Sequence, residues 1–131
     1  RSDRGVVRGL HYQIQRPQGK LVRVVRGAAF DAAVDIRRGS PTFGSWVGTE
    51  LSEANKLQMW IPAGFAHGFM ALVDGTELLY KATDFYDPET DRSIAWNDPA
   101  LAIDWPTAGI EPIVSGRDLI APPLSEAETY E

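Results

Sequence analysis

Short runs of apolar residues recur along the chain as far as Tyr86, and they are rich in valine, isoleucine, leucine and aromatic residues. The runs cover Leu21 to Val25, Phe30 to Ile36, Leu57 to Ile61, Phe69 to Val73 and Glu77 to Ala82. Their length and residue types favour strands over helices. Turn signals separate them, at Pro17-Gln18-Gly19, Arg26-Gly27, Arg38-Gly39, Pro62-Ala63-Gly64 and Asp74-Gly75, of which the last predicts a two-residue hairpin. The pattern predicts an all-β domain, either a sandwich, a jelly roll or a barrel.

The chain after Tyr86 has a different texture, because prolines interrupt every stretch that could form a regular element. They occur in Asp87-Pro88, Asp98-Pro99, Trp105-Pro106, Glu111-Pro112 and Pro122-Pro123. We expect this segment to form a loop-rich wrap over the barrel. Two segments favour helix, namely Ser52 to Lys56 and a capping box formed by Ser125 and Glu128. With no internal repeat and no linker, the sequence predicts a single domain over residues 1–131.

A chain of 131 residues, 44% of them hydrophobic, can bury roughly two-thirds of the surface that its unfolded form exposes. It contains no cysteine, so disulfides and sulfur-ligated metals are excluded, and we expect a cytoplasmic protein. We expect no membrane partner, because no apolar run approaches the roughly 20 residues needed to span a bilayer. The net charge of −5 argues against broad binding of nucleic acid but not against one small phosphorylated ligand.

The two histidines of the chain, His11 and His67, are candidates for chemistry near neutral pH, because imidazole transfers protons and binds metals. His67 ends the string Pro62-x-Gly64-x-x-His67, which resembles the second sequence box of the cupin superfamily, where a barrel turn delivers a histidine into the interior. In many cupins this histidine joins two others and a carboxylate around a metal. With two histidines, a three-histidine site in one protomer is impossible, whereas a site of two histidines and one carboxylate stays open.

Eight sequence segments, spread along nearly the whole chain, indicate a family relationship when they are taken together. They are Val7 to Gln13, Pro17 to Val24, Asp35 to Gly44, Trp60 to Phe69, Leu79 to Lys81, Asn97 to Pro99, Ile103 to Pro106 and Ser115 to Asp118. Together they resemble the dTDP-4-dehydrorhamnose 3,5-epimerase family, which are metal-free cupins of nucleotide-sugar biosynthesis. The resemblance implies a cupin-type jelly-roll barrel. It also implies a cofactor-free isomerase whose substrate is a dTDP-4-keto-6-deoxyhexose, as in dTDP-L-rhamnose biosynthesis.

The reaction of that family explains why such residues are needed. The C4 carbonyl of the sugar acidifies the C–H bonds at C3 and C5, so a base can remove a proton from one face while an acid returns a proton to the other. The resemblance assigns the base to His11, a carboxylate that orients it to Asp118, and the acid to Tyr80. It places Lys20 at the C4 oxygen, where an ammonium group stabilises the enolate charge.

The resemblance also suggests residues that bind substrate. Arg8 and Arg23 are candidates for the diphosphate, since guanidinium groups match phosphate oxygens in pairs, and Arg117 is a further cation. Tyr86 is a candidate to stack on the ligand. His67 is expected in the active centre, where it supports the base or contacts the substrate. A purely structural hydrogen bond inside the barrel stays open for His67.

The chain begins almost at the motif around His11, whereas family members carry a further N-terminal segment with strands and nucleotide contacts, often across a dimer interface. We expect this segment to be absent and a homodimer to cover the exposed strand edge. Three functions stay open. They are an epimerase acting at C3 and C5, a metal-dependent cupin enzyme, and a non-catalytic module that binds a nucleotide sugar. A C3-only or C5-only epimerase and a 3,4-ketoisomerase are alternatives within the first class.

Overall fold

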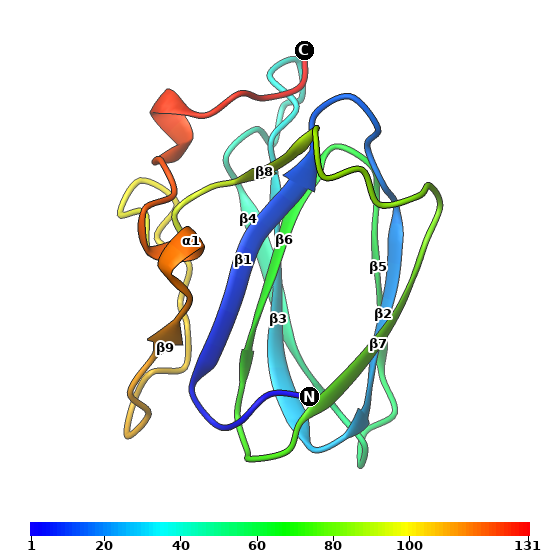
Figure 1. The fold of residues 1–131 in the computed structure, drawn as a ribbon, viewed down its shortest axis with the longest axis vertical. Coiled ribbons are helices and arrows are strands. Elements are labelled where there is room, and N and C mark those ends of the chain that lie inside the picture. Colours follow the sequence, from blue (N-terminus) through cyan, green and yellow to red (C-terminus); the bar gives the residue numbers. More distant parts are fainter.

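Two β-sheets face each other in the computed structural model, which describes residues 1–131 (Figure 1). The larger sheet has the strand order β4-β3-β6-β1-β8, with the short β9 paired to β1, and the smaller sheet has the order β5-β2-β7. The strands are β1 (Val6–Gln13), β2 (Lys20–Arg26), β3 (Ala28–Asp35), β4 (Trp46–Ser52), β5 (Gln58–Ile61), β6 (Phe65–Ala71), β7 (Glu77–Ala82), β8 (Asp91–Ser93) and β9 (Ile113–Val114). Helical structure is limited to α1 (Gly116–Leu119) and a 3-10 turn, η1 (Leu124–Glu126).

Strand β3 shows how the sequence builds two packed layers. Ala29 and Ala33 face the smaller sheet, in a buried cluster that also contains Val22, Val24, Leu51 and Ile61. Ala32 and Val34 point to the opposite face, in a cluster that includes Leu10, Met70, Ile94, Leu101 and Trp105. Successive residues of a strand point to opposite faces, so a strand covered on both sides reads as a continuous apolar run.

A bulge in β1 sets the direction of the side chains near its centre. Arg8 lies opposite Phe69 and His11 lies opposite His67, so three steps along β1 match two steps along β6. Residues directly opposite in an antiparallel pair share a face, and therefore Arg8 and His11 both project to the side of His67. Gly9 makes this close approach possible, because its φ is +130° and a Cβ there would lie 2.6 Å from the Cα of Gly68.

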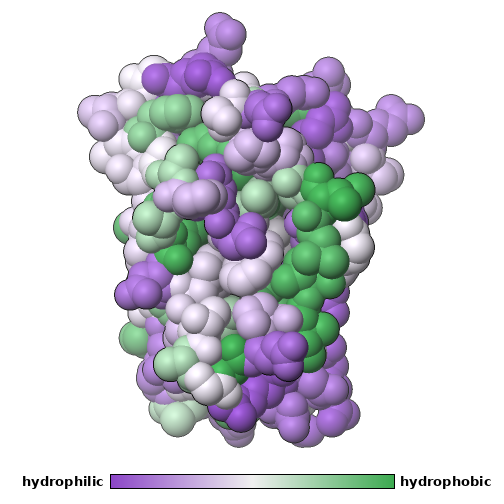
Figure 2. Space-filling view, turned by 90° about the vertical axis from the view of Figure 1, so that its left-hand side faces the viewer, coloured by the Kyte–Doolittle hydropathy of each residue, from purple (hydrophilic) through white to green (hydrophobic).

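The segment after β8 wraps the outer face of the larger sheet, as its yellow-to-red trace shows in Figure 1. Trp105 packs edge-on against Phe30 and Trp96, which anchors the wrap to β3. Figure 2 shows the side of the molecule that this segment forms, with a strip of apolar surface along one edge. Exposed hydrophobic side chains of the segment include Ile113, Leu119 and Ile120. Neither of the two short helical segments has the length or the apolar character that a membrane-spanning helix requires.

The prediction of an all-β fold with a loop-rich C-terminal wrap is confirmed. Strands β2, β3, β5 and β7 coincide with predicted runs to within two residues at each end. Strand β6 begins at Phe65, earlier than predicted, so that His67 lies inside a strand and not in the turn before it. Strands β1, β4, β8 and β9 and the helix α1 were not among the predicted elements.

Three local predictions are wrong. Ser125 does not cap a helix, because it lies inside the 3-10 turn η1, which follows Pro123 and has no side-chain cap hydrogen bond. Asp74-Gly75 does not close a hairpin, because it connects β6 of the larger sheet to β7 of the smaller one. Ser52 to Lys56 forms no helix. Instead, the side chain of Ser52 accepts a hydrogen bond from the backbone N–H of Asn55, whose side chain accepts one from the N–H of Ser52. Such side chains compete with the helix for backbone groups and stabilise turns.

Candidate active site

A cavity of about 160 Å³ lies at the end of the molecule where β1 ends and β2 begins. Its lining residues are His11, Tyr12, Gln13, Gln18, Lys20, Tyr80, Tyr86, Asp91 and Arg117. His11 comes from the larger sheet, whereas Lys20 and Tyr80 come from the smaller sheet. The fold therefore gathers five predicted site residues around one hollow. A hollow of about 330 Å³ adjoins it, sharing Tyr12, Asp91 and Arg117 in its lining.

His11 is held by Asp118, the carboxylate that the family resemblance implies. The Nε2 atom of His11 lies 2.7 Å from Oδ1 of Asp118, and the side chain of His11 is 31% exposed whereas that of Asp118 is 3% exposed. Asp118 also accepts a hydrogen bond from the backbone N–H of Gly9 through Oδ2, at 3.2 Å. An ionised carboxylate only accepts hydrogen bonds, so Nε2 of His11 donates to Asp118, and in the neutral imidazole Nδ1 is then the nitrogen that can accept a proton.

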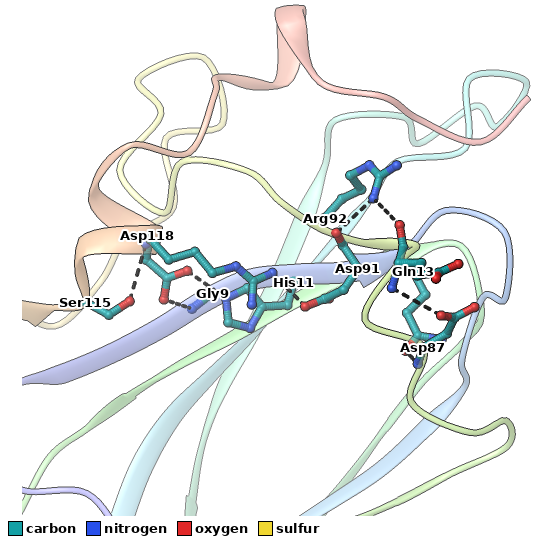
Figure 3. A network of polar contacts seen from close by, with 10 residues as sticks. Gly9, His11, Gln13, Asp87, Asp91, Arg92, Ser115 and Asp118 are labelled. Atoms are coloured by element: carbon teal, nitrogen blue, oxygen red, sulfur yellow. Dashed lines mark hydrogen bonds and ion pairs between the residues drawn. The ribbon is translucent and has the colours of Figure 1, made fainter.

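Helix α1 fixes the position of Asp118. The hydroxyl of Ser115 caps this short helix and accepts a hydrogen bond from the backbone N–H of Asp118 at 3.3 Å. Figure 3 shows Asp118 between Ser115 on the C-terminal wrap and the residues Gly9 and His11 on β1, so that its contacts join the wrap to this strand. The wrap thus supplies the group that orients an imidazole on the barrel.

Lys20 and Tyr80 lie together on the smaller sheet. Tyr80 is opposite the buried Val22, so its side chain projects to the inner side of that sheet. The Nζ of Lys20 is 5.7 Å from the centre of the Tyr80 ring, within the range of a cation–π contact. Burial lowers the pKa of Lys20, while the negative charges of Asp91 and Asp31 act in the opposite direction. Burial thus disfavours the ammonium form of Lys20, whereas the two carboxylates, and any anionic ligand beside Nζ, favour it.

Asp91 links the two sides of the cavity rim. It lies on β8 opposite Gln13, and its Oδ2 pairs with the Arg117 guanidinium at 2.7 Å. Asp91 was not among the predicted site residues, because nothing in the proline-rich segment around it distinguishes one carboxylate from the others. Arg117 was predicted to contact the ligand, and in the structure its charge is shared with Asp91.

His67 forms a second histidine–aspartate pair, with Asp31 of β3. Its Nε2 lies 2.7 Å from Oδ1 of Asp31, and the two side chains are 9% and 0% exposed. The other carboxylate oxygen of Asp31 is buried without a hydrogen-bond partner. His67 does not line the cavity of His11. Asp31 was not among the predicted site residues, although it is one of two carboxylates, with Asp35, in the otherwise apolar run from Phe30 to Ile36, and a charged group in such a run is a signal for a buried pair.

Two predicted phosphate ligands lie away from this cavity. Arg8 shares the face of His11, but it is exposed, and its Nε donates to the hydroxyl of Ser2 at 3.3 Å. Arg23 lies opposite Gln58 and Leu79 on the outer face of the smaller sheet. There it lines a separate hollow of about 290 Å³ with Glu53 and Lys56 among its neighbours. Lys20 and Arg23 are three residues apart on a regular strand, so their side chains point to opposite faces.

The arrangement of donors favours proton transfer over metal binding. No group of three or more histidine, aspartate and glutamate side chains lies close enough to hold a metal ion. Each imidazole instead contacts a carboxylate of its own, Asp118 for His11 and Asp31 for His67. The His11 side chain is partly exposed, whereas the His67 pair is buried. An imidazole and a phenol from opposing sheets, with a lysine beside the phenol ring, can act on two faces of one small ligand.

Comparisons with known proteins agree on one family. The sequence profile of the dTDP-4-dehydrorhamnose 3,5-epimerases matches residues 1–126. A protein of that name from Pseudomonas aeruginosa is 58% identical over 130 residues, which is 99% of this chain and 71% of the relative. A dTDP-4-dehydrorhamnose 3-epimerase from Streptomyces niveus is 46% identical, over 96% of this chain and 60% of the relative.

A solved structure adds the same result in three dimensions. The crystal structure of a dTDP-6-deoxy-D-glucose-3,5-epimerase from Legionella pneumophila, in complex with dTDP-4-keto-L-rhamnose, superimposes with a TM-score of 0.92 at 53% identity. The match covers 97% of this chain and 67% of that one.

Proposed function

Because the chain belongs to the dTDP-4-dehydrorhamnose 3,5-epimerase family, we propose that its cavity binds a dTDP-4-keto-6-deoxyhexose and inverts the sugar at C3 and C5. The observation that carries this proposal is the placement of His11 and Tyr80. They reach one cavity from opposing sheets, so a proton can leave one face of the sugar and arrive on the other.

His11 is the base of this reaction. Its Nδ1 takes the proton from C3 or C5, and the electron pair of the broken C–H bond moves into an enolate on the C4 oxygen. Asp118 holds the ring through Nε2 and stabilises the positive imidazolium that forms. The hydrogen bond from Gly9 keeps the carboxylate in place, because it occupies the second oxygen of Asp118.

Tyr80 is the acid, and Lys20 supports both charged species. Tyr80 donates its phenolic proton to the carbon from the face opposite His11, and the electron pair of the enolate forms the new C–H bond. The ammonium of Lys20 stabilises the enolate oxygen and the phenolate that remains, since it lies beside the Tyr80 ring. No cofactor is required, because every proton that leaves or returns is carried by these side chains.

The remaining residues are assigned to substrate binding. Arg117 and Tyr86 both line the cavity, and we assign the guanidinium of Arg117 to the charged part of the nucleotide and the ring of Tyr86 to its flat base. Arg8 lies outside the cavity lining but on the same face of β1 as His11, and it stays a candidate to contact the diphosphate beyond the cavity. The roles predicted for Arg23 and His67 in binding are not supported by the positions of these residues. A homodimer and a cytoplasmic location stay predictions from the sequence.

Single epimerisation is the second candidate, because the Streptomyces niveus relative is named as a 3-epimerase. Incubation with dTDP-4-keto-6-deoxyglucose in heavy water distinguishes the two, with proton NMR as the readout. Deuterium at both C3 and C5 is the expected result, and exchange at one carbon alone would contradict double epimerisation. The variant Tyr80→Phe is expected to retain some exchange while inversion is suppressed, since the base remains and the opposing acid is lost.

A further inference from the structure

Both peptide groups that adjoin Tyr86 are held by one side chain, that of Gln13 at the end of β1. Its Oε1 accepts a hydrogen bond from the Asp87 N–H at 2.8 Å, and its Nε2 donates to the Phe85 carbonyl at 3.2 Å. Nε2 also donates to the Arg16 carbonyl at 2.9 Å. Figure 3 shows the side chain of Gln13 lying next to Asp87. Both amide protons are therefore used, and the three partners define which end of the amide points where.

The Tyr86 ring has little else to hold it. Tyr86 is 68% exposed and its neighbour Phe85 is 80% exposed, whereas Gln13 is 2% exposed. A loop with few buried apolar contacts depends on its backbone hydrogen bonds for its position. Other contacts hold the start of the loop, where Gln18 donates to the Asp84 carbonyl at 2.7 Å and Arg16 pairs with the Asp84 carboxylate at 3.4 Å. These contacts do not reach the peptide groups on either side of Tyr86.

Gln13 and His11 are two residues apart on β1, beyond its bulge, so their side chains share a face. One strand therefore carries the base and the side chain that holds the Tyr86 loop. We propose that Gln13 is a positioning residue, which fixes the Tyr86 ring at a set distance from His11 so that the ring stacks on the nucleotide base while the sugar lies at His11. This inference rests on the proposed function, because it takes a nucleotide sugar as the ligand.

The test is the isosteric variant Gln13→Glu, which turns a carboxylate oxygen toward the carbonyls of Arg16 and Phe85. The expected result is a rise of about ten-fold in KM for dTDP-4-keto-6-deoxyglucose and in Kd for dTDP, because stacking on the base is weakened. The value of kcat is expected to stay within about three-fold of wild type, since the lost contact binds ground state and transition state alike. An unchanged KM and Kd would overturn the proposal.

A double-mutant cycle with Tyr86→Ala decides whether Gln13 acts through the ring. Tyr86→Ala alone is expected to weaken dTDP binding to a similar extent, and adding Gln13→Glu to it is expected to change Kd by less than about two-fold. Fully additive effects would overturn the proposal. Arg16→Ala is the matched control, because it removes a side-chain contact to the same loop and leaves the Tyr86 peptide groups held.

Folding and function are separated in the same experiment. Gln13→Met keeps the buried volume without the hydrogen bonds, and it is expected to reproduce the rise in Kd if Gln13→Glu does not fold. Loss of folding in both variants would overturn the proposal, because Gln13 would then serve the fold as a whole. Calorimetric binding of dTDP does not require turnover. Failure of the wild-type protein to exchange deuterium would therefore count against the proposed function and leave the dTDP result as the measure of Gln13.

Discussion

The two histidine–aspartate pairs of this protein make the same contact between imidazole and carboxylate, but they lie in different surroundings. In both, Nε2 of the histidine lies 2.7 Å from a carboxylate oxygen, and His11 and His67 are direct neighbours across β1 and β6. The His11 pair opens to a cavity and takes its carboxylate from the C-terminal wrap, whereas the His67 pair is sealed between strands of the barrel. An imidazole oriented by a carboxylate becomes a base for a ligand only where the ligand can reach its other nitrogen.

The strongest test of this comparison substitutes each histidine in turn. His11→Asn is expected to lower kcat on the order of 10³-fold, because the proton acceptor is lost. His67→Asn is expected to lower it by no more than about ten-fold, since His67 lies outside the cavity lining. Deuterium exchange at C3 and C5, followed by NMR, measures both. Comparable losses in the two variants would show that the sealed pair also takes part in the chemistry.

Removal of the two carboxylates is expected to separate catalysis from stability. Asp118→Ala should lower kcat on the order of 10²-fold, because the ring loses the group that fixes its tautomer. Asp31→Ala should instead lower the free energy of unfolding by about 2 kcal/mol, since it leaves the buried Nε2 of His67 without a partner. Urea unfolding and the exchange assay, applied to both variants, give the two quantities. A larger loss of stability in Asp118→Ala than in Asp31→Ala would contradict the comparison.

The smallest expected effect is a shift in the pH dependence of the reaction. It tests whether Asp91, at the rim of the open cavity, changes the pKa of Lys20 inside it. Burial lowers the pKa of Lys20. As the pH rises, kcat/KM is therefore expected to begin to fall at a pH lower than the usual pKa of a lysine side chain. The charge of Asp91 raises this pKa, and Asp91→Asn should therefore move the alkaline limb to lower pH. In Lys20→Arg the limb due to this group should vanish, because guanidinium keeps its proton. A limb that stays in place in both variants would assign it to another group.

Much of the fold can be predicted from the sequence, because the alternation of buried and exposed residues along a strand is a local pattern. The alternation in β2 and β7 and the prolines after Tyr86 predict strands and a wrap without knowledge of any contact. The candidate site is readable to the extent that motifs name residue types, and five of the named residues meet at one cavity. Asp31 and Asp91 were missed, since a carboxylate becomes part of a site through neighbours from other strands.

The pairing of His11 with Asp118 could not be derived from spacing, because 107 residues separate them and a four-residue helix delivers the carboxylate. Its assignment depended on resemblance to a family, and the structure supplies its physical basis. Gln13 is a similar case, since its partners at Phe85 and Asp87 lie more than 70 residues away.

Two pairs of residues with equal spacing show which side-chain directions follow from the sequence alone and which depend on the pairing of strands. Lys20 and Arg23 are three residues apart on a regular strand, so the period of two alone determines that they point to opposite faces. Arg8 and His11 are also three residues apart, yet they share a face. The reason is the bulge at Gly9, where β1 and β6 approach so closely that no side chain fits between Gly9 and Gly68. The sequence by itself determined the strands and the types of residue available for chemistry, and the pairing of strands decided which of them could act on one ligand.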